Sequence, residues 1–138
     1  MTMRVLAGVL ATAGLLAAVA GVRALSPAPD EAVVREIMIH YSRFEPTSLS
    51  VPRGVPVTFV LVNRDPIAHE WLIGDEAFHQ RHRHGDEPQH GARATEVSIA
   101  PLGRAETTIT FAEAGTYAYI CHLPGHEAYG MVGTLTVT

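Results

Sequence analysis

The stretch that decides the fold runs from Gly115 to Met131 and reads Gly-Thr-Tyr-Ala-Tyr-Ile-Cys-His-Leu-Pro-Gly-His-Glu-Ala-Tyr-Gly-Met. In its first part, bulky residues alternate with small ones up to Cys121, which is typical of a strand with one buried face. The Leu-Pro-Gly turn at 123–125 cannot continue a strand, so it brings His126 back toward the sulfur of Cys121. The stretch therefore predicts a core strand and one tight loop that together carry a thiol, an imidazole and a thioether.

A second histidine, His69, lies far upstream in a separate apolar segment. Thiolate, two imidazoles and a thioether form a soft ligand set that suits copper cycling between Cu(I) and Cu(II), as in blue-copper sites. We therefore predict that His69, Cys121, His126 and Met131 bind one copper ion. Zinc is disfavoured because a thioether is a poor zinc ligand. Separately, these residues would be read as an inert cysteine, a surface histidine and a core methionine, but their joint spacing argues against that.

Elsewhere, short runs of alternating or β-branched residues are separated by Gly and Pro turns. This pattern predicts an all-β sandwich. The expected strands cover 35–42, 49–51, 55–62, 69–73, 95–99, 106–111, 116–121 and 131–137. The polar segment 75–93 is the exception, because it has neither a strand pattern nor helical periodicity. It carries His79, His82, His84 and His90, and we expect a long functional loop there.

The 138 residues fit one domain. Residues 1–24 start with a basic residue and continue as an apolar, small-residue run, which predicts a secretory signal peptide. The run is about long enough to span a bilayer, so an uncleaved N-terminal membrane anchor is the alternative. Residues 25–34 form the expected linker and 35–138 the domain. Either route exports the domain, so we expect a periplasmic or other extracytoplasmic location.

The charge argues against a nucleic-acid-binding protein, and the cysteine content argues against an internal disulfide. Ten basic and 14 acidic residues give a net charge of −4, and the sequence contains no lysine. A nucleic-acid partner is disfavoured because it requires a basic face. The single Cys121 cannot form an internal disulfide, and metal ligation would protect its thiol from oxidation. The sequence does not determine the oligomeric state.

The chain resembles the cupredoxin family, to which plastocyanin and azurin belong. The matching residues are Phe111-x3-Gly115-x-Tyr117-x-Tyr119-x-Cys121-x4-His126-x4-Met131, with Val51-Pro-Arg-Gly54 and Asn63-x5-His69-Glu70 upstream. The likeness covers 35–138 and is strongest to small exported bacterial cupredoxin-like copper-binding proteins. It implies a Greek-key β-sandwich that binds one type 1 copper through His69, Cys121 and His126, with Met131 as a weak axial ligand.

Glu70 and His122 each follow an expected ligand directly in the sequence. In plastocyanin and azurin an Asn typically follows the first histidine, where this chain has Glu70. A carboxylate there would place negative charge near the metal, stabilise Cu(II) and lower the reduction potential. His122 follows Cys121 directly, and strand alternation turns it to the opposite face. We expect His122 at the surface rather than in a catalytic copper site.

The predicted site favours one-electron transfer, because a type 1 site has no open coordination position for a substrate. We expect no enzymatic activity, since an oxidase or nitrite reductase would need further copper ligands from a second domain or subunit. The expected partner is a redox protein that binds transiently through a small interface. Copper storage, delivery or resistance is the alternative, with a copper donor or acceptor as partner and a second, weaker metal site in the His79–His90 loop. A solvated loop without metal is the other interpretation of these histidines.

Overall fold

The computed structural model describes residues 33–85 and 93–138. The predicted export segment 1–24 and residues 25–32 of the predicted linker lie outside the described residues. The first strand, β1 (Val33–Ile39), begins two residues ahead of the predicted domain start at Arg35. It also ends earlier than expected, because Tyr41 adopts a φ of 52° and is 82% exposed. In the described part of the chain, no helix has the length and apolar character needed to cross a membrane.

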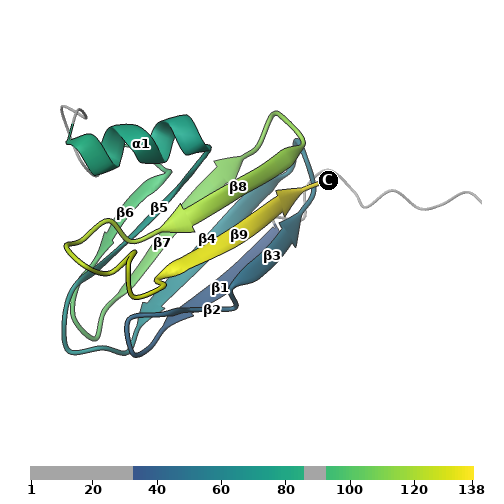
Figure 1. Cartoon of the computed structure of the whole chain (residues 1–138). Coiled ribbons are helices and arrows are strands. Elements are labelled where there is room, and N and C mark those ends of the chain that lie inside the picture. The colour runs from purple at the N-terminus through teal and green to yellow at the C-terminus, as the bar shows by residue number, and fades with distance from the viewer. Residues whose placement is uncertain (1–32, 86–92) are drawn as a thin grey trace, which may run out of the picture.

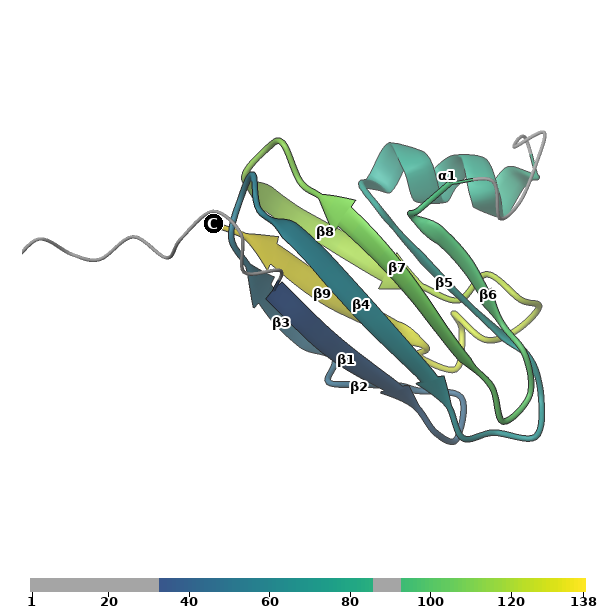
Figure 2. The same cartoon turned by 180° about the vertical axis from the view of Figure 1, so that it is seen from behind.

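Within residues 33–85 and 93–138, nine strands form two facing sheets, which confirms the predicted all-β sandwich (Figures 1 and 2). The first sheet has the order β2-β1-β4-β7, and the second has the order β3-β9-β8-β5-β6. The remaining strands of the first sheet are β2 (Phe44–Glu45), β4 (Pro56–Asn63) and β7 (Arg104–Thr110). The second sheet contains β3 (Ser48–Val51), β5 (His69–Gly74), β6 (Glu96–Ile99), β8 (Gly115–Ile120) and β9 (Val132–Val137).

The connections have the Greek-key character that the resemblance implied. The chain passes repeatedly from one sheet to the other, so consecutive strands are often not neighbours. Two pairs of neighbours are parallel, β1 with β4 and β3 with β9, while the other pairs run antiparallel. The loop between β8 and β9 lies at the end of the sandwich opposite the C-terminus (Figure 1).

The core fills the space between the sheets with side chains from alternating strand positions. In β4, Phe59 points inward and packs on Trp71 of β5, with ring centroids 4.9 Å apart. Tyr119 of β8 is fully buried in the same cluster. Cys121 and Met131 belong to this cluster too, and both are fully buried. The predicted thiol and thioether therefore lie where the hydrophobic core meets the end of the sandwich.

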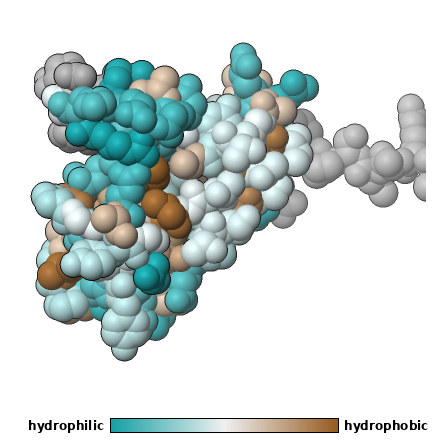
Figure 3. Space-filling model, in the orientation of Figure 1, coloured by the Kyte–Doolittle hydropathy of each residue, from teal (hydrophilic) through white to brown (hydrophobic). Residues whose placement is uncertain are grey.

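The expectation that 75–93 contains no helix was wrong for its first part. Helix α1 (Glu76–His84) begins after Asp75, whose carboxylate caps it by accepting a hydrogen bond from the backbone N–H of Phe78 at 2.8 Å. It ends at Gly85, which adopts the left-handed conformation with φ 69°. The helix contacts β5 and β8, and its outer surface is hydrophilic (Figure 3).

The periodicity of α1 is hidden because histidines supply most of its buried face. The buried residues of the helix are Phe78, His79 and His82. These positions share one side of a helix, but imidazoles count as polar in a hydrophobic pattern. The Asp75 cap, Gly85 and the basic last turn are the signals from which the helix was predictable. His90 lies outside the described residues.

Candidate metal centre

The predicted ligands come from the ends of two adjacent strands and the loop that follows one of them. His69 is the first residue of β5, and Cys121 directly follows β8. His126 lies in the β8–β9 loop and Met131 directly precedes β9. Backbone hydrogen bonds close the loop, from Cys121 N to Met131 O at 3.2 Å and from Met131 N to His126 O at 3.0 Å. This ladder holds the ligand positions close together.

Three of the four predicted ligand side chains converge on one point. The Nδ1 atoms of His69 and His126 are 3.2 Å apart, and Cys121 Sγ is also 3.2 Å from His126 Nδ1. All three donor atoms lie within 4.8 Å of one another. One thiolate and two imidazole nitrogens in this arrangement are the equatorial donors of a type 1 copper site, so the residues fit copper.

The fourth predicted ligand, Met131, is placed near these donors by its burial and its backbone contacts. Met131 is fully buried and belongs to the same core cluster as Cys121. Its backbone hydrogen bonds place it beside both Cys121 and His126. A position next to two ligands in an apolar environment suits a weak axial donor, and this role for Met131 stays a prediction.

The imidazole of His69 is oriented by the carboxylate of Asp65, a residue that was not among those predicted from the sequence to belong to the site. The Nε2–H of His69 donates to Asp65 Oδ2 at 2.9 Å, which directs Nδ1 toward the ligand cluster. Asp65 in turn accepts the backbone N–H groups of Tyr41 and Ser42, each at 2.7 Å. The only hint in the sequence was an acid four residues ahead of a predicted ligand.

The loop that carries Asp65 is itself fixed by a buried amide. Asn63 donates from Nδ2 to the backbone oxygens of Ile67 at 2.8 Å and Ala100 at 2.9 Å. Its Oδ1 accepts the backbone N–H of Asp65 at 2.9 Å. The side chains behind His69 are thus positioned before any metal binds.

The model of one protein family matches this chain over residues 33–138: copper binding proteins, plastocyanin/azurin family. The chain belongs to that family. The match covers every strand of the sandwich and all four predicted ligands. The family assignment and the His69–Cys121–His126 cluster together identify copper as the metal that this site binds.

Two curated relatives and one solved structure show what this cupredoxin is similar to. Copper-resistant cuproprotein CopI of Rubrivivax gelatinosus is 35% identical over 108 residues, which cover 75% of this chain and 65% of that protein. This chain therefore spans slightly less than two thirds of that relative. CopI of Pseudomonas aeruginosa is 30% identical, with 74% of each chain covered. Auracyanin A, a "blue" copper protein from Chloroflexus aurantiacus, is 28% identical with a TM-score of 0.62, covering 78% of this chain and 100% of that one.

The thiol of Cys121 is held in an environment that keeps it protonated until a metal binds. Burial raises the pKa of the Cys121 thiol, and the negative charge of Glu70 acts in the same direction. The backbone N–H of Glu70 donates to Cys121 Sγ at 3.4 Å and lowers this pKa, but burial outweighs it. Metal binding at this site is therefore coupled to the loss of the thiol proton.

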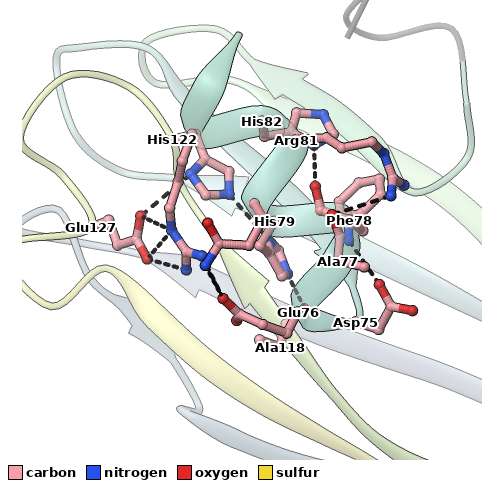
Figure 4. A network of polar contacts seen from close by, with 12 residues as sticks. Asp75, Glu76, Ala77, Phe78, His79, Arg81, His82, Ala118, His122 and Glu127 are labelled. Carbon is pink, nitrogen blue, oxygen red and sulfur yellow. Dashed lines mark hydrogen bonds and ion pairs between the residues drawn. The ribbon is translucent and has the colours of Figure 1, made fainter. Parts of the chain in front are cut away.

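A second group of histidines lies on the other side of β8, between the strand and helix α1 (Figure 4). His79 Nδ1 is 2.9 Å from His122 Nε2, and the His122 side chain is only 7% exposed. The prediction that His122 lies at the surface was therefore wrong, because α1 covers it. Burial lowers the pKa of His122 to about 4 and also lowers that of His79. His84 is exposed on the same helix, so it differs from the buried His79 and His82.

Proposed function

We propose that this protein is an exported one-electron carrier that uses a single type 1 copper and catalyses no bond chemistry. The observation that carries the proposal is the convergence of His69, Cys121 and His126 at the buried end of the core. Copper bound there supplies exchange of one electron between Cu(I) and Cu(II). Export is supported by the apolar, small-residue character of residues 1–24.

Rigid support of the ligands favours electron transfer. Asp65 fixes the ring of His69, and the backbone N–H of Glu70 points at the sulfur of Cys121. A site held in this way changes little between oxidation states, which keeps the reorganisation cost of each transfer low.

The surface around the ligand end suits a transient partner. His126 is partly exposed, whereas His69 and Cys121 are buried, so the imidazole of His126 offers the route for electrons. Exposed apolar side chains occupy the loops at this end of the sandwich: Tyr41, Ile67, Leu102 and Tyr129. Scattered apolar residues around a redox centre support a small, weak interface of the kind used by electron carriers.

A Cu(II) titration of the full chain tests the proposal, followed by visible absorption and EPR, with Cys121→Ser as the control. We expect an intense thiolate-to-copper band that saturates at one copper per chain and is absent from the variant. A pale complex that persists unchanged in Cys121→Ser would contradict the site and with it the electron-carrier role.

Copper handling is a second candidate, favoured by the two relatives whose names describe copper resistance. Such a role requires copper to leave the protein readily. Competition with a copper chelator distinguishes the two functions. Copper retained through repeated reduction and oxidation supports electron transfer, whereas rapid loss to the chelator supports storage or delivery.

A further inference from the structure

Two histidines that the type 1 site does not use lie face to face between α1 and β8. His79 and His122 are 43 residues apart in the chain, yet their Nδ1 and Nε2 atoms approach to 2.9 Å. His79 is fully buried, and the side chain of His122 is 7% exposed. Figure 4 shows the two rings turned toward each other beside Glu127. Buried polar groups of this kind are normally satisfied, and 2.9 Å is a hydrogen-bond distance, so the ring protons decide what each nitrogen can bind.

The outer nitrogen of each ring, which points away from the other histidine, faces an acceptor. His79 Nε2–H donates to the backbone oxygen of Ala118 at 3.0 Å, and His122 Nδ1 lies 3.4 Å from Glu127 Oε2. If each outer nitrogen carries its ring proton, the two inner nitrogens present lone pairs to each other. Two neutral imidazoles carry two N–H groups, so a ring proton is missing either from the contact between the two rings or from the 3.4 Å contact with Glu127. A cation bound by both inner nitrogens, to one side of the line that joins them, completes the arrangement, and metal-binding histidines are commonly oriented by a carbonyl or carboxylate in this way.

Distance and charge both suit a metal ion. Two nitrogens bound to one ion at about 2.0–2.1 Å and at right angles lie about 2.9 Å apart. This is the separation found between the rings of His79 and His122. Nearby, Arg83 forms ion pairs with both Glu76 at 2.9 Å and Glu127 at 2.6 Å. Two carboxylates and one guanidinium leave one negative charge beside the pair, which favours a cation.

We propose that His79 and His122 bind a second copper ion, as Cu(II), with Glu127 as the carboxylate that orients His122. Imidazole suits copper, and Cu(II) is the divalent first-row ion that such sites bind most tightly. A surface groove of about 410 Å³, lined by His122 and Glu127 among other residues, borders the pair on the His122 side.

His82 stands beside this site without contributing a ligand. Its ring stacks on that of His122 with centroids 5.7 Å apart. His82 Nδ1–H donates to the backbone oxygen of Phe78 at 3.0 Å, and Nε2 lies 3.9 Å from a carboxylate oxygen of Glu96. Both nitrogens therefore point away from the pair. The second site thus goes beyond the one-electron role, because it shares no ligand with the type 1 site.

The test is a two-stage copper titration of the full chain. The first equivalent of Cu(II) fills the type 1 site, and its thiolate band reports that the protein is folded and that this site is intact. The second equivalent is then added against a competing chelator, and EPR follows the new signal. We expect nitrogen-ligated Cu(II) without a thiolate band. Its affinity falls at least tenfold in His79→Gln and His122→Gln and is unchanged in His84→Gln, the exposed histidine of the same helix.

The outcomes separate this proposal from the electron-carrier role. Equal affinity for the second equivalent in wild type and His79→Gln, with the thiolate band intact, overturns the second site and leaves the type 1 site standing. If His79→Gln fails to fold, the same titration is carried out on Glu127→Gln, a substitution on the surface loop. A ten- to hundredfold weaker second equivalent in that variant supports the site, and no change refutes it.

Discussion

Asp65 and His69 are joined by a hydrogen bond of 2.9 Å in which the imidazole Nε2–H donates to the carboxylate. Burial alone would raise the pKa of Asp65, but backbone N–H donors from Ser42 and Tyr41, together with His69, hold it below its usual range. The carboxylate therefore stays charged behind the ring of His69. A negative charge in this position makes the imidazole a stronger donor and favours the more highly charged Cu(II).

Replacing Asp65 with Asn should raise the reduction potential. We expect the affinity for Cu(II) to fall about 10- to 100-fold, as for other groups that orient metal ligands. Each tenfold loss of Cu(II) relative to Cu(I) corresponds to a rise of about 59 mV. Redox titration of the visible band measures it, with the exposed carboxylate of Glu106 replaced in Glu106→Gln as the control. A potential equal to that of wild type would show that the carboxylate does not tune the metal.

Glu70→Gln should raise the potential as well, by less than Asp65→Asn. The negative charge of Glu70 acts on the thiol of Cys121, but its side chain is partly exposed and water screens it. The backbone N–H bond to the sulfur is unaffected by this substitution, so the visible band should keep its position. An effect larger than that of Asp65→Asn would reverse the ranking proposed for the two carboxylates.

Met131→Leu tests the axial-ligand role. The exchange nearly conserves volume, so we expect it to reduce the free energy of unfolding by less than about 1.5 kcal/mol. Loss of the sulfur donor should raise the reduction potential while the thiolate band persists, because the axial ligand tunes the potential. Leu135→Met, at another fully buried position of the same core, is the matched control and should leave the potential unchanged. Equal potentials for wild type and Met131→Leu would make Met131 a core residue only.

Copper binding should release a proton from Cys121 and strengthen as the pH rises. The pKa of the thiol is raised, so the metal-free site retains this proton at neutral pH and copper must displace it. Below that pKa, the apparent copper affinity should rise about tenfold per pH unit. A pH-stat titration near pH 7 should record about one proton per thiolate-bound copper, and Cys121→Ser should not release this proton.

Gly133→Ala should destabilise the sandwich without involving the ligands. A Cβ at Gly133 would collide with the ring of Tyr119, its partner across β8 and β9. Tyr119 cannot move away easily, because it is fully buried and its hydroxyl donates to the backbone oxygen of Pro46 at 2.6 Å. We expect a loss of about 1–3 kcal/mol in the free energy of unfolding. Urea denaturation measures this loss, and Thr136→Ala on the exposed face of β9 should stay within about 0.5 kcal/mol of wild type.

Most of the strands could be read from the sequence because alternation is a local property. Each predicted strand has a counterpart in the structure, with ends that differ by a few residues. The early end of β1 is an example, since Tyr41 continues the alternation but points into solvent. Its backbone N–H is instead held by Asp65, a contact across 24 residues that no local pattern contains.

The sequence by itself determined that Cys121 and His126 lie close together at the type 1 site. Cys121 and His126 lie on one strand end and one short loop, and a Leu-Pro-Gly turn can only fold the chain back on itself. Local spacing is enough to bring such donors together, and the alternation of the flanking strands fixes which side of the sheet they share.

Only the tertiary structure decided which side chains orient the ligands and which lie next to the site. Asp65 supports His69 because three loops meet at one end of the sandwich, and His79 faces His122 because α1 packs over β8. These pairs depend on how separate segments pack, and a histidine on the buried side of a short helix looks polar in the sequence until a sheet covers it. Short-range spacing brings Cys121 and His126 together, whereas the approach of His69, the charges around the site and the second histidine pair arise from contacts between distant parts of the chain.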